Sequence, residues 1–260
     1  MSAAARRLWP YQLALLTALI GAWHALTAAG LLSPFFFGRP LEVARVLGTW
    51  FGSGSIFPHL GVTLLETLLA FAGGTLLGVL CGLWLGLSPF AAALLDPYIK
   101  AANAMPRVVL APIFAMWLGL GIWSKVLLGV TLVFFIVFFN VYQGVKDVNP
   151  VIVDNARMLG ASRRQLLRYV YWPSALSWVF SSLHTAVGMA FVGAVVGEYL
   201  GSAKGVGYLI LQAEGSFDVN AVLAGIVVLT ICALLLDTAV TRLERRLLRW
   251  RPGQGDAAHF

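Results

Sequence analysis

Residues 60–87 read LGVTLLETLLAFAGGTLLGVLCGLWLGL, and Glu66 is the only charged residue among them. A membrane-spanning α-helix needs about 20 consecutive, mostly apolar residues. Comparable runs occupy 11–32, 91–121, 124–144, 174–198 and 220–241. The sequence therefore predicts an all-α, polytopic membrane helix bundle with six transmembrane helices. We expect a single transmembrane domain over 11–260, after a tail at 1–10 and with a closing tail at 242–260.

The overall composition fits a membrane protein better than a soluble one. Hydrophobic residues make up 60% of the 260 residues and charged residues only 11%, whereas soluble domains carry about 25% charged residues. The net charge of +7 comes from basic residues beside apolar runs, which favours anionic lipid over nucleic acid as a partner. Cys81 and Cys232 lie inside apolar runs, so we expect neither a disulfide nor a metal site.

The first run, 11–32, follows Arg6 and Arg7 as the core of a secretory signal would. It is longer than the roughly 7–15 residues of a signal core. We therefore expect a retained first helix.

The third run, 91–121, is the least regular. It is interrupted by Asp96, Pro97, Lys100, Pro106, Arg107 and Pro112. Irregular backbone at membrane depth is tolerated only where it is buried in protein or lines a wet cavity. This segment is therefore expected inside the bundle.

Basic residues are distributed unevenly between the two ends of the predicted spans. Two precede the first span, five lie in the 145–172 loop and five follow residue 241, whereas the opposite side holds Arg39, Arg45 and Lys204. Lys100, Arg107 and Lys125 are assigned to neither side. Cytoplasmic loops carry the excess of Lys and Arg. The pattern predicts that both termini are cytoplasmic.

A glycine recurs every fourth residue in the second span, at Gly74, Gly78, Gly82 and Gly86. These residues share one helix face and allow a neighbouring backbone to approach closely. Two interpretations stay open: packing within the subunit, or contact with a second copy of the chain.

The loop 145–173 predicts two short helices. Asn149-Pro150 is a typical helix start, Gly160 a typical stop, and Ser162 to Gln165 a capping box for a second helix that Pro173 ends. Such a preorganised, partly apolar element fits a groove on a partner protein. The alternative is an amphipathic linker lying on lipid.

This loop resembles the coupling loop of ABC-type import permeases. Their pattern is Glu-Ala-Ala, three residues, Gly, nine residues, Ile, one residue, Leu-Pro. Here the corresponding residues are Asp154-Asn155-Ala156, Gly160 and Val170-Tyr171-Trp172-Pro173, with identical spacing. Asn155 departs most, because it places an amide where the family has a small apolar side chain.

Further stretches look like the nitrate/sulfonate/taurine branch of these permeases. They are Met105-Pro106-Arg107, Ala111-Pro112, Gly160-Ala161-Ser162, Glu198-Tyr199-Leu200-Gly201 and Gly205-Val206-Gly207-Tyr208-Leu209. The resemblance implies a permease for a small anionic solute. Nitrate, taurine, other sulfonates, aromatic acids and pyrimidines all remain open as the substrate.

The resemblance also implies a location in the bacterial inner membrane, and it implies partners. Two permeases, expected as a homodimer, would line the pathway, two cytoplasmic ATPases would dock on the loops, and an extracytoplasmic binding protein would deliver the solute. This chain would bind no cofactor, since ATP and Mg²⁺ would belong to the ATPase. The implied coupling residues are Asp154, Asn155, Ala156, Leu159, Gly160, Ala161, Ser162, Leu166, Val170 and Pro173.

Polar side chains inside membrane spans are costly and mark pathways or internal pairs. Asp96 and Lys100 are spaced to pair with each other, and Arg107 is suited either to an anion or to an interface. The pathway candidates are Glu66, Asn103, Arg107, His184 and Glu198. His184 is alternatively a packing residue, and Glu198 alternatively a headgroup contact.

Two other function classes compete with the permease. The sequence holds no His-Glu-x-x-His, Gly-x-Ser-x-Gly or Walker A motif, so an enzyme is not expected. A secondary transporter driven by an ion gradient is the alternative, but no clear internal repeat supports it.

The Gly205-Val206-Gly207 segment predicts a hinge before a short helix at the outer mouth.

Overall fold

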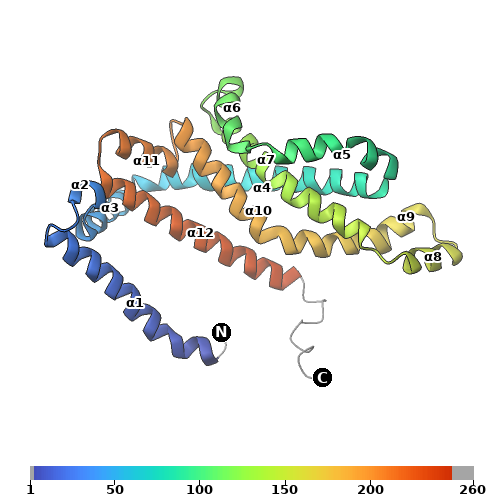
Figure 1. The fold of residues 1–260 in the computed structure, drawn as a ribbon, viewed down its shortest axis with the longest axis horizontal. Coiled ribbons are helices and arrows are strands. Elements are labelled where there is room, and N and C mark those ends of the chain that lie inside the picture. Colours follow the sequence, from blue (N-terminus) through green and yellow to red (C-terminus); the bar gives the residue numbers. More distant parts are fainter. Residues whose placement is uncertain (1–2, 248–260) are drawn as a thin grey trace.

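The computed structural model describes residues 3–247, and these are helical almost throughout, with no strand among them (Figure 1). The all-α prediction is confirmed. The basic tail residues Arg249 and Arg251 lie outside the described residues. The helices are α1 (Ala3–Ala28), α2 (Pro34–Phe37), α3 (Pro40–Gly52), α4 (Ile56–Leu87), α5 (Pro89–Ala104), α6 (Ala111–Leu118), α7 (Ile122–Lys146), α8 (Pro150–Met158), α9 (Arg163–Leu166), α10 (Trp172–Leu200), α11 (Val206–Gly215) and α12 (Val219–Leu247).

Five helical segments in the described part are long and apolar enough to cross a membrane. They lie in α1, α4, α7, the continuous stretch Arg163–Leu200 and α12. The sixth is a bent pair, α5 followed by Arg107–Leu118, with an angle of 83° between its halves. Counted as one span, this pair gives the six spans that the sequence predicts.

The bend in the third span follows from Pro106. Proline disfavours the helical conformation in the residue before it, and Met105 is extended, with ψ of 134°. After the break the chain forms a 3-10 helix, Arg107–Leu110, and then α6. The run 91–121 is therefore two half-helices rather than one rod.

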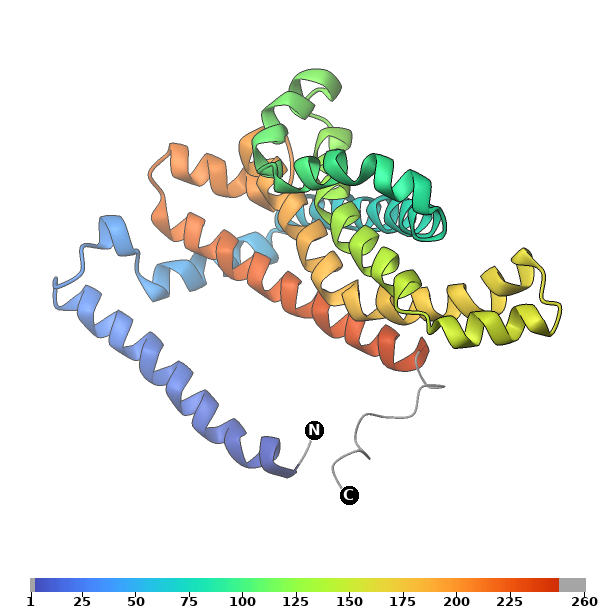
Figure 2. The ribbon, with the colours of Figure 1, turned by 45° about the vertical axis from the view of Figure 1, so that its right-hand side comes forward.

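Helices α4, α7 and α10 pack together as the centre of the bundle (Figures 1 and 2). Their shared core is built from small and β-branched side chains, namely Ala70, Val133, Val137, Val141, Val145, Ala175, Val179, Ala186 and Ala190. Small side chains at helix interfaces let backbones approach closely in a membrane.

The glycines of α4 face a row of valines on α7. A Cβ atom built on Gly74, Gly78, Gly82 or Gly86 would lie 2.6–2.9 Å from side-chain or backbone atoms of α7. The nearest valines are Val133, Val137, Val141 and Val145, which also recur every fourth residue. The four glycines thus pack within the subunit, the first of the two interpretations.

Helix α1 lies apart from the bundle (Figures 1 and 2), and its spanning window is only 6% buried. A hydrogen bond from Trp23 Nε1 to Phe37 O, 3.2 Å, ties it to α2. Because α1 is apolar and exposed, its surface suits lipid or another chain.

Helix α11 folds back at the end of the bundle opposite α8 and α9 (Figure 1). It packs against α10 and α12. The Gly205-Val206-Gly207 segment leads directly into it, at the place where the sequence predicts a short helix.

Pro173 lies in the first turn of α10, so the fifth span starts where the sequence predicts, but no break separates it from the second helix of the 145–173 loop. That second helix continues into the fifth span, so that Arg163–Leu200 is one helical stretch. A π-helical turn at Leu167–Tyr171 precedes the proline, and Trp172 N–H donates to Leu167 O. This wider turn accommodates a proline that lacks an N–H.

Candidate functional site

The 145–173 segment projects from one end of the bundle as a pair of short helices (Figure 2). Asn149 caps α8 by accepting from Val151 N–H at 2.9 Å. At the other end of α8, Gly160 has φ of +83°, and Gly160 N–H and Ala161 N–H donate to Arg157 O and Ala156 O. This is a Schellman motif, which requires a left-handed residue.

Helix α9 begins with the capping box that the sequence predicts. Gln165 N–H donates to Ser162 Oγ at 3.3 Å, and Ser162 N–H donates to Gln165 Oε1 at 2.8 Å. Caps at both sides of the turn fix the two helices relative to each other, because they satisfy the free backbone groups locally.

Apolar side chains stand out from this pair of helices. Leu159 is 89% exposed and Met158 79%, and a groove of about 230 Å³ lies between the helices, lined by Leu159, Gly160, Tyr169 and Val170 among others. Of the residues expected to couple, Leu166 is buried and supports the pair from inside. The family pattern does not include Met158 and Tyr169, which are highly exposed here.

Of the remaining coupling candidates, Ala156 and Ala161 also line this groove. Asp154 is exposed and pairs with Arg157, with 3.3 Å between Oδ1 and Nη1. Those with exposed side chains or backbone are Asp154, Asn155, Leu159, Gly160, Ser162 and Pro173, and those partly buried are Ala156, Ala161 and Val170.

Arg107 lies at the bend of the broken third span. Its Nη2 donates to Asn103 O at 2.9 Å and to Asn103 Oδ1, and its guanidinium carbon lies 4.4 Å from the centre of the Phe135 ring. Nε is buried without a hydrogen-bond partner among the described residues. Among residues 3–247, no carboxylate forms an ion pair with Arg107.

The other charged residues of this span form a pair of their own. Lys100 Nζ lies 2.7 Å from Asp96 Oδ2, and both side chains are mostly exposed. This is the i, i+4 pairing that the sequence predicts. Within the part of the chain that the structure describes, Arg107 is therefore the cation of this span that has no acidic partner.

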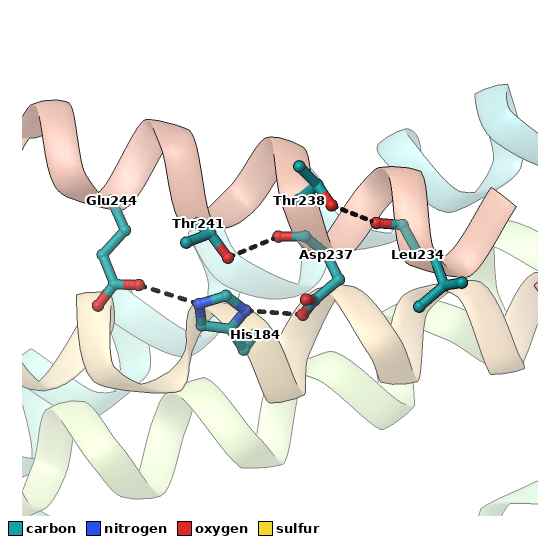
Figure 3. A network of polar contacts seen from close by, with 6 residues as sticks. All are labelled: His184, Leu234, Asp237, Thr238, Thr241 and Glu244. Atoms are coloured by element: carbon teal, nitrogen blue, oxygen red, sulfur yellow. Dashed lines mark hydrogen bonds and ion pairs between the residues drawn. The ribbon is translucent and has the colours of Figure 1, made fainter. Parts of the chain in front are cut away.

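His184 joins α10 to α12 (Figure 3). Its Nδ1 lies 3.0 Å from Asp237 Oδ1 and its Nε2 3.0 Å from Glu244 Oε2. Both carboxylates belong to α12. Asp237 is the only charged residue in the run 220–241, and a lone charge in an apolar run indicates a polar partner. The sequence could not identify His184 as that partner, because the two residues are 53 positions apart.

Glu66 and Glu198 come together at the end of the bundle that carries α11, and both are fully buried. Lys125 of α7 is buried beside them. The sequence favours a gate or the headgroups for Glu198 and does not single out Lys125. The five pathway candidates thus form three separate sites: Glu66 with Glu198, Asn103 with Arg107, and His184 alone.

Comparison with known proteins gives a consistent result. Residues 74–249 match the family described as binding-protein-dependent transport system inner membrane component. The chain is 31% identical over 243 residues to the putative aliphatic sulfonates transport permease protein SsuC of Bacillus subtilis, covering 94% of this chain and 88% of that protein. It is 32% identical over 240 residues to the taurine transport system permease protein TauC of Escherichia coli, covering 90% and 87%.

A solved structure shares the fold. The crystal structure of an amino acid ABC transporter with histidines superposes with a TM-score of 0.63 at 19% identity, covering 77% of this chain and 97% of that one. Together with the apolar helices, these likenesses identify a multi-pass protein of the inner membrane. The chain belongs to the family of binding-protein-dependent transport system inner membrane components, and it is the permease subunit of an ATP-binding cassette importer.

Proposed function

We propose that two copies of this chain line a pathway for a small organic sulfonate. Separate ATPases, which hold ATP and Mg²⁺, dock on the α8–α9 end, and a binding protein delivers the solute at the α11 end. Both termini then lie in the cytoplasm, as the distribution of Lys and Arg predicts. We choose an anion as the solute because the guanidinium of Arg107 has no acidic partner among residues 3–247.

A cation without an anion is costly inside a membrane protein. Charged groups within membrane spans normally pair with one another or face a water-filled cavity. Arg107 uses one nitrogen to bind Asn103 and has no acid partner in the described chain. An arriving anion would supply the missing acceptor.

A sulfonate suits this position chemically. The planar guanidinium binds oxyanions through two parallel N–H donors, which a point charge does not offer. The Phe135 ring covers one face of the guanidinium, and exclusion of water there strengthens its electrostatic attraction. The names of the relatives, one for aliphatic sulfonates and one for taurine, favour the same class of solute.

The docking of an ATPase on α8 and α9 is supported by their exposed apolar side chains. Val151, Met158 and Leu159 are each more than half exposed on a pair of helices that leaves the bundle. A short helix with apolar anchors fits a groove on a protein. Movement of that groove would pass directly into α10, which is continuous with α9.

The test is uptake of labelled taurine into proteoliposomes that contain the complete transporter, with the binding protein outside and Mg-ATP inside. Arg107→Gln should reduce uptake about tenfold or more, because a hydrogen bond to a charged group is worth about 1.5–3 kcal/mol. Arg107→Lys should recover only part of the loss, since Lys lacks the planar pair of donors.

Lys100→Gln is the matched control, because Lys100 lies on the same broken span and already pairs with Asp96. It should transport as the parent does. Equal uptake by the Arg107→Gln and Lys100→Gln variants would rule out the anion site.

A further inference from the structure

A fully buried polar cluster occupies the α11 end of the bundle. Glu198 of α10 has an exposed fraction of 0%, and Glu66 of α4 and Lys125 of α7 each have 1%. The proposed anion site at Arg107 does not involve these residues. Three elements of the central bundle therefore each contribute a titratable side chain to one point beside α11.

The Glu198 carboxylate binds the start of α11 and the side of α4. Oε2 accepts from Gly207 N–H at 2.7 Å, and Oε1 accepts from Thr63 Oγ1 at 2.6 Å. Thr63 Oγ1 in turn accepts from Val206 N–H at 3.0 Å. The first N–H groups of a helix lack partners within it and attract negative charge, so Glu198 and Thr63 together cap α11.

The backbone at this point is shaped around the carboxylate. Gly205 has φ of +114°, and a Cβ there would lie 2.1 Å from Glu198 Cδ. A Cβ on Gly207 would lie 2.6 Å from Val195 O. Only glycine fits at either position, so these two glycines create the space that the Glu198 carboxylate occupies beside α11.

Lys125 extends the cluster to the broken third span. Its Nζ donates to Leu120 O at 2.5 Å and to Gly121 O at 2.9 Å. Both carbonyls belong to the turn between α6 and α7. The cluster thus connects α11 with the turn that follows the broken third span.

One oxygen of the cluster remains unsatisfied. Glu66 Oε2 is buried and has no hydrogen-bond partner among the described residues. A buried polar atom without a hydrogen-bond partner adds a cost, and even well-paired buried charges add little stability compared with apolar packing. Such a cluster is therefore a weak way to hold α11 permanently against the bundle. It suits a junction whose contacts are made in one state and exchanged for water in another.

We propose that Glu198, Thr63 and the Gly207 N–H form a latch that holds α11 closed over the outer end of the pathway. The latch breaks when the transporter opens to the outside. Glu198 and Thr63 are positioning residues, because they act on α11 and not on the solute. The inference rests on the proposed function, which places α11 at the outer mouth.

The first test is ATP hydrolysis by the complete transporter in proteoliposomes with Mg-ATP and without binding protein. Thr63→Val removes the hydroxyl and keeps the shape. Losing a hydrogen bond to a charged acceptor should shift the open–closed equilibrium about tenfold toward open, so hydrolysis without the binding protein should rise by a similar factor. Thr63→Ser keeps the hydroxyl and should restore the low rate.

Thr67→Val is the matched control. Thr67 lies one turn further along α4 and is equally buried, but its hydroxyl donates only to Thr63 O within the helix, at 2.7 Å. The latch predicts an increase for Thr63→Val and none for Thr67→Val. A fall in hydrolysis with Thr63→Val, or equal rates for both variants, overturns it.

A second readout does not depend on the partners. Val206 is fully buried at the start of α11, so Val206→Cys, with Cys81 and Cys232 replaced by Ala, reports its exposure to a membrane-impermeant maleimide. Thr63→Val should speed labelling about tenfold over Thr67→Val, and equal labelling contradicts the latch. Failure of the binding protein to stimulate the parent transporter would count against the proposed function, whereas labelling still decides the latch.

Discussion

Gly160 is the residue that sets the geometry of the turn between α8 and α9. Its φ of +83° is in the left-handed region, where a side chain costs about 1 kcal/mol. The Schellman bonds at Arg157 O and Ala156 O depend on that conformation. A residue that prefers negative φ would therefore strain the turn and redirect α9 relative to α8.

We expect Gly160→Asp to abolish uptake and to weaken binding of the ATPase, while the bundle still inserts, because Gly160 lies at the turn outside the spans. The measurement is co-purification of the ATPase with the tagged permease, alongside uptake. Asp154→Ala should have a smaller effect, about 0.3–1 kcal/mol, as the loss of an exposed charge.

The control for strain is Gly30→Asp. Gly30 has φ of +75°, and at Gly30, as at Gly160, an added Cβ atom would meet no other atom within 4 Å. The two substitutions introduce a similar strain at different places, so Gly30→Asp should leave ATPase binding intact. If both variants bind the ATPase normally and transport, the α8–α9 turn is not the coupling element.

Among the helices, α4 and α7 share the most extensive contact in the bundle. A Cβ on Gly78 would lie 2.9 Å from Phe134 O and from Val137 Cβ, so any side chain there must push backbone away. We expect Gly78→Leu to lower the free energy of unfolding of the purified permease by about 1–3 kcal/mol, the usual cost of overpacking.

Gly61→Leu on the same helix provides the comparison, because nothing lies within 4 Å of its Cβ position. It should leave the melting temperature in detergent unchanged. A Gly78→Leu variant as stable as Gly61→Leu would mean that the two helices are not in contact.

Local signals predicted these elements well. The period-four glycines, the cap at Asn149, the capping box at Ser162 and the stop at Gly160 are all read from neighbouring residues, and the structure has each of them. The continuation through Pro173 was not predictable in the same way. Pro173 does lie in the first turn of α10, as its missing N–H favours, but the π-helical turn at Leu167–Tyr171 joins that helix to α9 without a break.

For the molecule as a whole, the membrane topology gives the sharpest prediction. If the six spans place both ends in the cytoplasm, as we propose, reporter fusions after Phe260 and within 202–216 should give opposite signals. The reason is the concentration of Lys and Arg in the 145–172 loop and the two tails. Matching signals from the two fusions would contradict the six-span arrangement.

Contacts between distant residues were the part that the sequence did not reveal. His184 meets Asp237 and Glu244 across 53 and 60 residues, and Glu198 meets Thr63 across 135. A lone polar residue in an apolar run indicates a pathway or a polar partner, but the neighbouring sequence does not identify which residue that partner is. The side of each helix that faces its neighbour is decided by packing of the assembled bundle.

The continuity of Arg163–Leu200 has a mechanical consequence. A helix of 38 residues is about 57 Å long, at roughly 1.5 Å per residue. The stretch bends along its length (Figures 1 and 2), so its ends are less than about 57 Å apart, and a tilt of about 5° about its α8–α9 end would displace its far end, where Glu198 lies, by at most about 5 Å. Such an amplitude exceeds the length of a hydrogen bond. A force applied to the α8–α9 end on one face of the membrane would thus move the other end mechanically, with no intermediate chemical step.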